Sequence, residues 1–167
     1  SIPFPIGPNG MIAPFMDDLD DDDSENPPPL DVYYYHDSDE NIFIVEWDNI
    51  HNGEDNQDCS IEGYECVTET FQLILYDPAH YPTTTGDGEI KFQYKEIHDV
   101  DDHGSTVGIE SPDKNTGVQY LFNYEYANNE NTLHDSLAIR FTSNMDLDIK
   151  KKLLPEGYRL NIYPNPF

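Results

Sequence analysis

The sequence has few basic residues, and none of them occurs in its first half. Lysine and arginine together number 8 against 34 aspartate and glutamate residues, which gives a formal charge of −26 at neutral pH. The first basic residue is Lys91. Nucleic acids and anionic membrane surfaces are bound through lysine and arginine side chains that contact phosphate groups. We therefore exclude nucleic acids and anionic membrane surfaces as partners.

Long apolar runs are also absent. No segment approaches the roughly 20 apolar residues that a membrane-spanning helix needs. The amino end, SIPFPIGPNG, lacks the basic region and the apolar region of a secretory signal peptide. We expect a mature, soluble chain that does not insert into a membrane.

Cysteine is scarce, because the chain contains only Cys59 and Cys66, which bracket the polar segment SIEGYE. Two thiols at this spacing can close a small disulfide loop, and disulfides form in oxidising, extracytoplasmic compartments. The alternative is a pair of metal ligands, but a structural zinc site takes four ligands and the sequence has no second cysteine pair. The sequence predicts a disulfide between Cys59 and Cys66.

The familiar catalytic motifs are missing as well. The six histidines form no His-Glu-x-x-His pair, no serine stands in a Gly-x-Ser-x-Gly elbow, and no glycine-rich phosphate loop occurs. Paired carboxylates can hydrolyse glycosides, yet among 34 acidic residues some pairs fall close together by chance. We expect a protein that is not an enzyme.

Aromatic residues are abundant, with 12 tyrosines and 8 phenylalanines, and this composition favours strands. Apolar and polar residues alternate in two segments, 71–75 and 90–94, on either side of a loop rich in proline and glycine. Alternation with period two predicts two strands of a hairpin with one buried face. Two apolar rows are then expected to lie side by side on that face, Phe71/Leu73/Leu75 and Ile90/Phe92/Tyr94.

Turn residues recur about every ten positions in the rest of the chain, as is typical of a β-sandwich. The strand at 41–50 is apolar on both faces and is expected to be central, and a turn or two of helix is expected within 144–157. The sequence thus predicts an all-β, antiparallel β-sandwich with one long hairpin and little helix. A chain of this length favours one domain, which we place at 1–157, with 158–167 as a linker that holds a short strand. The other predicted strands are 32–36, 105–111, 118–126 and 136–142.

An acidic run, DDLDDDD, is the candidate for a calcium site, because Ca²⁺ takes six to eight oxygen ligands and one loop can supply several carboxylates. Its spacing does not match an EF-hand, since Asp23 stands at the glycine position and Pro29 at the final glutamate position. A solvated acidic loop is the alternative. A second, weaker candidate comprises Asp99, Asp101 and Asp102. The calcium ligands that we predict are Asp17, Asp18 and Asp20.

Tyrosine side chains are the candidates for a binding face, although a sandwich rich in tyrosine needs no such explanation. The single tryptophan, Trp47, sits inside an apolar strand and is expected in the core. The tyrosines that we expect at the surface are Tyr33, Tyr34, Tyr35, Tyr64, Tyr81 and Tyr126.

Six segments occur in the order in which similar segments occur in one known family. They are PNGMIAPFMDDLD, VYYY, IVEWDNI, ETFQLILYD, GEIKFQYKEI and STVGIES. In this order the sequence resembles the nidogen-like domain, an extracellular module of basement-membrane and mucin-type proteins. It departs from the family at Met16, where an aromatic residue is expected, and the strands that precede the PNG segment in the family have no counterpart here. The end NIYPNPF resembles the start of the sorting domain of bacterial type IX secretion cargo.

The resemblance implies a non-catalytic structural or adhesion module that is secreted or held at the outer surface of a bacterial cell. Strands missing at the start would leave a sheet edge unpaired, and an unpaired edge can bind another chain. The apolar ends SIPFPIG and RLNIYPNPF are therefore candidates for donation to a neighbouring copy as added strands, with filaments as one outcome. The alternative is that the ends pack on their own domain or are frayed. A neighbouring surface protein is the other candidate partner. The alternative function is a carbohydrate- or calcium-dependent binding module that serves a secreted enzyme.

Overall fold

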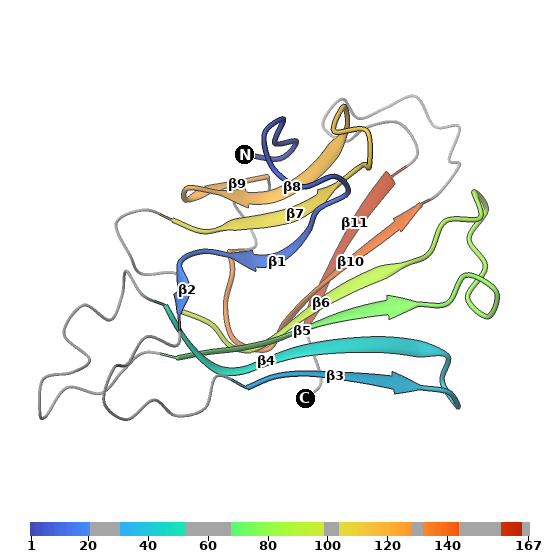
Figure 1. Cartoon of the computed structure of the whole chain (residues 1–167), viewed down its shortest axis with the longest axis horizontal. Coiled ribbons are helices and arrows are strands. Elements are labelled where there is room, and N and C mark those ends of the chain that lie inside the picture. Colours follow the sequence, from blue (N-terminus) through green and yellow to red (C-terminus); the bar gives the residue numbers. More distant parts are fainter. Residues whose placement is uncertain (21–30, 53–67, 99–103, 128–131, 144–157, 165–167) are drawn as a thin grey trace, which may run out of the picture.

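The structure, a computed structural model, describes residues 1–20, 31–52, 68–98, 104–127, 132–143 and 158–164, of which residues 20, 31 and 158–164 are described by their backbone. These residues form eleven strands and no helix. The strands make two antiparallel sheets that pack face to face (Figure 1). The predicted all-β, antiparallel sandwich is confirmed.

The smaller sheet has four strands in the order β1-β7-β8-β9. Its last two strands are joined by Asn123 and Tyr124, whose φ angles are 47° and 65°. Two successive residues in the left-handed region form the tight turn of a two-residue hairpin. The prediction of a single strand over 118–126 is therefore wrong, because the chain reverses at these two residues. The strands are β1 (Ile12–Met16), β7 (Thr106–Glu110), β8 (Gly117–Phe122) and β9 (Glu125–Tyr126).

The larger sheet has seven strands in the order β11-β10-β6-β5-β4-β2, and β3 also pairs with β4. Strand β4 is long enough to pair with β3 along its first part and with β2 near its end. The strands are β2 (Leu19–Asp20), β3 (Asp31–Asp37), β4 (Ile42–Asn52), β5 (Thr68–Tyr76), β6 (Ile90–Glu96), β10 (Leu137–Ser143) and β11 (Tyr158–Pro164).

The central hairpin places its two apolar rows side by side, as its alternation predicts. Phe71 lies opposite Tyr94, Leu73 opposite Phe92, and Leu75 opposite Ile90. Directly opposite residues of an antiparallel pair share one face. That face points to the second sheet, where Phe71, Phe92 and Tyr94 are fully buried. The two predicted rows are therefore confirmed.

The core lies between this face and the inner face of the smaller sheet. Phe71 is at its centre, with ring centroids 5.8 Å from Phe15 of β1, 4.9 Å from Trp47 and 6.4 Å from Tyr94. Trp47 is half-buried and packs against this cluster, as the sequence predicts. Besides Phe15, the smaller sheet contributes the buried side chains of Val107, Val118, Tyr120 and Leu121.

One buried hydrogen bond joins the two sheets. The hydroxyl of Tyr94 in β6 donates to the backbone carbonyl of Pro14 in β1 at 2.6 Å. Burial raises the pKa of Tyr94 well above its ordinary value, and the nearby Tyr120 and Tyr126 raise it further. The neutral phenol is therefore the form that the folded protein holds.

We expect Tyr94→Phe to lower the free energy of unfolding by about 1 kcal/mol at pH 8, because the Pro14 carbonyl loses its donor. An unfolded tyrosine releases its proton at about pH 10, whereas folded Tyr94 keeps it. The stabilisation from Tyr94 is thus complete below pH 10 and is lost as the pH rises further. Urea unfolding measures the free energy of unfolding of the unchanged protein and of Tyr94→Phe at pH 8 and pH 10.5. The difference between the two proteins should be smaller at pH 10.5 than at pH 8. An unchanged difference would contradict this account.

Both ends of the described chain pack on their own domain. Ile2 is buried against β7 and β8, where Gly108 and Gly117 leave room for its side chain, and its N–H donates to Gln119 Oε1 at 2.9 Å. Strand β11 pairs with β10 from Leu137↔Pro164 to Ser143↔Tyr158. The structure thus places SIPFPIG and the described part of RLNIYPNPF on their own sandwich, which is the alternative to strand donation. The domain boundary at residue 157 stays a prediction, and the expected helical turn within 144–157 lies outside the described residues.

Candidate functional site

Strand β3 forms one edge of the seven-stranded sheet. It pairs with β4 from Asp31↔Asp48 to Asp37↔Ile42 without a shift in register. Within the described ranges no strand pairs along its other side. The turn that follows it is fixed by Asp37, whose Oδ1 accepts hydrogen bonds from the N–H groups of Asp39 and Glu40, both at 3.0 Å. The strand and turn predicted here are confirmed.

Four successive large side chains of β3 are exposed. The exposed fractions are 44% for Val32, 51% for Tyr33, 78% for Tyr34 and 61% for Tyr35. Successive side chains of a strand point to opposite faces, so apolar surface is exposed on both faces of this edge. The expectation of surface tyrosines at these three positions is confirmed.

The inner face of the sheet is covered unevenly. One row of residues runs across it from β3 to β6, in the order Tyr34, Val45, Leu73 and Phe92. Phe92 and Leu73 are buried, Val45 is half-buried, and Tyr34 is exposed. The smaller sheet therefore covers β5 and β6 but not β3, which lies far from it in the view of Figure 1.

Because the smaller sheet does not reach β3, the expectation that β4 is a central strand is wrong. The sequence predicts a central strand there because its residues are apolar on both faces. In the structure β4 lies one strand from the edge, and residues 42–48 are half-buried on both faces. The ring of Phe43 stacks on the exposed ring of Tyr34, with centroids 6.1 Å apart. We name the exposed residues Val32, Tyr33, Tyr34 and Tyr35 of β3 the aromatic edge.

Strand β3 lacks the features that normally prevent an edge from binding another chain. Such features are lysine, proline, a β-bulge or a very short strand. Between Asp31 and Asp37 the sequence has no lysine, arginine, proline or acidic residue. The pairing with β4 is regular over seven positions. The aromatic edge is thus suited to strand addition.

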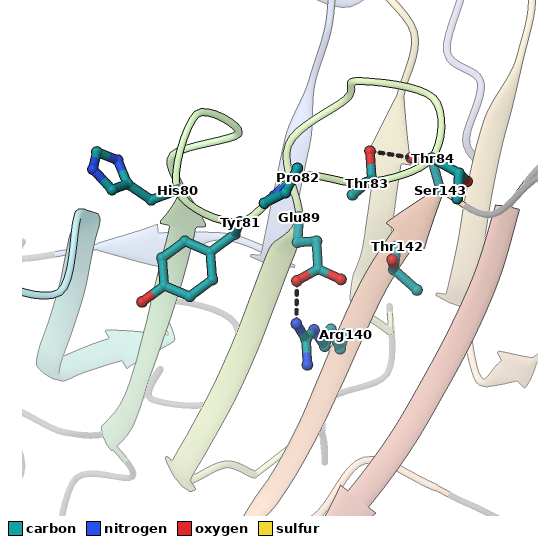
Figure 2. Close-up of a pocket in the computed structure, with 9 residues that line it drawn as sticks. All are labelled: His80, Tyr81, Pro82, Thr83, Thr84, Glu89, Arg140, Thr142 and Ser143. Carbon is teal, nitrogen blue, oxygen red and sulfur yellow. Dashed lines mark hydrogen bonds and ion pairs between the residues drawn. The ribbon is translucent and has the colours of Figure 1, made fainter.

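A second feature is a pocket of about 490 Å³ beneath the loop that joins β5 and β6. Figure 2 shows Arg140 of β10 and Glu89 facing each other below the part of the loop that carries Pro82 and Thr83. The two side chains form an ion pair, in which Arg140 is 37% and Glu89 is 13% exposed. The lining residues are His80, Tyr81, Pro82, Thr83, Thr84, Glu89, Arg140, Thr142 and Ser143.

The predicted calcium ligands are only partly described. Asp17 accepts hydrogen bonds from the side-chain amide of Asn52 and from the N–H of Asp18, both at 3.0 Å. The side chain of Asp18 is exposed, and that of Asp20 is not among the described ones. No group of three acidic, histidine or cysteine side chains within the described residues is placed to hold a metal ion. Calcium at Asp17, Asp18 and Asp20 stays a prediction.

Other predicted residues lie outside the described ranges. These are the disulfide pair Cys59 and Cys66, the second acidic candidate at Asp99, Asp101 and Asp102, and Tyr64. Of the other expected surface tyrosines, Tyr81 is half-buried beside the pocket, and the half-buried ring of Tyr126 packs edge-on against Tyr120 at 5.7 Å. The disulfide stays a prediction.

Comparisons of the chain with protein families, curated proteins and solved structures find no match. The resemblance to the nidogen-like domain and to the type IX sorting segment therefore stays a prediction that depends on the quoted segments. In the part of the chain that the structure describes, no helix has the length and apolar character to cross a membrane.

The exposed tyrosines of β3 are predicted from the sequence, whereas the pocket is not. Arg140 and Glu89 belong to segments about fifty positions apart, and they meet because β10 pairs with β6. Each residue by itself resembles an ordinary surface charge. The one sequence signal is the rarity of arginine and lysine in so acidic a chain.

Proposed function

We propose that this chain is a non-catalytic structural or adhesion module, secreted or held at the outer surface of a bacterial cell, that associates with a second copy of itself. The contact is strand addition between β3 of one copy and β3 of the other. The observation that carries the proposal is the run of exposed side chains from Val32 to Tyr35 on an edge without protecting features.

Charge favours β3 as the place where two such acidic molecules meet. Each copy carries a formal charge of −26, so most of their surfaces repel each other. Residues 32–36 contain no acidic side chain. Two copies can therefore approach along this segment without placing acidic side chains within it against one another.

The sequence of β3 also indicates the register of the contact. In an antiparallel pair centred on Tyr33, Val32 lies opposite Tyr34 of the other copy, and Asp31 lies opposite Tyr35. A pair centred on Tyr34 would instead place Asp31 opposite Asp37, and like charges directly opposite are destabilising. We infer the first register, which joins apolar side chains across the contact. Such a two-fold contact closes on itself, so it gives a dimer, and a filament would need a second kind of contact.

Sedimentation velocity at increasing protein concentration tests this proposal. We expect a monomer–dimer equilibrium that shifts toward the dimer as salt is raised, because salt screens the repulsion between two highly acidic copies. A basic partner would show the opposite salt dependence. The mass of a single chain at every protein concentration, at both low and high salt, would contradict self-association.

A further inference from the structure

The pocket beneath the β5–β6 loop has a fixed shape. Inside the loop, the N–H of Tyr81 donates to the carbonyl of Asp77 at 2.8 Å, and the hydroxyl of Thr83 donates to the carbonyl of Asp87 at 2.7 Å. The hydroxyl of Ser143 donates to Thr83 Oγ1 at 3.1 Å and so ties the loop to the end of β10. Binding to a site that is already ordered costs less conformational entropy. The hollow, of about 490 Å³, is open to solvent rather than enclosed, so a ligand would lie across it with one side in water.

The charges around the pocket disfavour an ionic ligand. Arg140 and Glu89 form an ion pair at the pocket, and Lys91 lies directly opposite Arg140 in the sheet. An anion would meet the carboxylate of Glu89 and the charge of −26 on the whole chain. A cation would meet Arg140 and Lys91. A neutral ligand avoids both kinds of repulsion.

The polar lining offers both donors and acceptors. The guanidinium of Arg140 only donates hydrogen bonds and the carboxylate of Glu89 only accepts them, whereas hydroxyl groups do both. Each hydroxyl of a ligand can likewise donate and accept. A ligand with several hydroxyls therefore matches this lining better than an apolar one. Among the lining hydroxyls, those of Tyr81, Thr83 and Ser143 already donate within the protein and can only accept from a ligand. The hydroxyl of Thr142 can do both, and Thr84 also belongs to the lining.

One wall of the pocket is apolar and is held in place by tyrosine contacts. Tyr81 and Pro82 form this wall. The hydroxyl of Tyr81 donates to the carbonyl of Glu40 at 2.7 Å, and its ring meets the ring of Tyr76 edge-on at 5.0 Å. Tyr76 in turn lies beneath the guanidinium of Arg140, 5.5 Å from the ring centroid. The wall and the charged pair are thus parts of one ordered arrangement.

We propose that this pocket binds a neutral saccharide of one or two rings. The hydroxyls of the sugar bond to Arg140, Glu89 and Thr142, and one apolar C–H face of its ring packs on Tyr81 and Pro82. This site is separate from the aromatic edge and does not depend on self-association.

Amide NMR spectra recorded during titration test the site, with glucose, galactose and N-acetylglucosamine as the neutral probes and glucuronate as the anionic one. A ligand of this size is expected to bind with a Kd of about 1 mM. We expect saturable shifts at 80–84, 89–90 and 140–143 with at least one neutral sugar. Thr142→Val should weaken that binding about fivefold, the effect of one lost hydrogen bond. Thr116→Val, at an exposed turn of the smaller sheet, should leave it unchanged.

Three results would overturn the proposal. These are the absence of saturable shifts with all three neutral sugars, shifts confined to other parts of the chain, and tighter binding of glucuronate than of glucose. The titration is repeated on Tyr34→Lys, a change in the aromatic edge. Loss of self-association with unchanged sugar binding would separate the two proposals from each other.

Discussion

Tyr34→Lys is expected to raise the dissociation constant of the dimer by about 30-fold or more, the effect of losing an interface residue worth at least 2 kcal/mol. Tyr34 is 78% exposed in the single chain, so its replacement should change the free energy of unfolding by no more than about 0.5 kcal/mol. In the dimer the same position lies opposite Val32 of the other copy, so the replacement removes an apolar contact between the two strands at two symmetric positions. Lysine is also a residue that natural edge strands use to prevent pairing.

A matched control separates this effect from a general effect of charge. Ile6 is 85% exposed and belongs to the amino-terminal segment, away from β3. Ile6→Lys adds the same charge to the chain and also replaces an exposed apolar side chain. Because it reduces repulsion between acidic copies, it should leave dimerisation unchanged or strengthen it slightly. Equal weakening by both variants, measured by sedimentation at one salt concentration, would show that β3 is not the contact.

Phe71→Ala is expected to lower the free energy of unfolding by about 3–5 kcal/mol, the usual cost of removing a fully buried phenylalanine side chain. The ring packs between the two sheets and contacts Phe15, Trp47 and Tyr94, so its loss leaves a cavity at the centre of the core. Most of the stability of a domain of this size could be lost by this change. Denaturant unfolding of the variant measures the effect.

Phe43→Ala provides the comparison for this prediction. Phe43 projects from the same face of the same sheet, but it is half-buried and lies beside the exposed Tyr34. Removing the Phe43 ring should lower the free energy of unfolding by less than half as much as removing the Phe71 ring, because solvent already reaches part of the site. Similar losses for the two variants would show that the inner face is covered as far as β4.

The sequence was most informative where structure depends on neighbours along the chain. Alternation in 71–75 and 90–94 predicts that both apolar rows lie on one face of a hairpin, because a slip of one residue would move a whole row to the other face. The exact register of β5 with β6 comes from the structure, because a slip of two residues would keep both rows buried. The turn at Asn123 and Tyr124 could not be predicted in this way. Tyrosine rarely adopts a positive φ, so the aromatic residues on both sides of this turn appeared to form one strand.

Two features depend on tertiary packing and could not be predicted from local patterns. They are how far the smaller sheet covers the inner face of the larger sheet, and the pocket beneath the β5–β6 loop. The apolar residues of β4 show that the strand can be buried on both faces, but not whether the smaller sheet reaches it. Trp47 is close enough to contact Phe71, whereas Val45 and Phe43 lie progressively farther out. Likewise, no local pattern brings Arg140 to Glu89, because their contact follows from the pairing of β10 with β6.

The uneven cover of the seven-stranded sheet also determines how the molecule opens. Local opening costs least where few apolar contacts are lost, and it costs most in the buried core. From β6 to β3 the inner face changes from fully buried at Phe92 to exposed at Tyr34. The amide hydrogens of β3 should therefore exchange with solvent through small, low-energy fluctuations. Those of β6 should exchange only when the whole domain unfolds. A partner strand on β3 would protect the backbone amides of this edge from exchange.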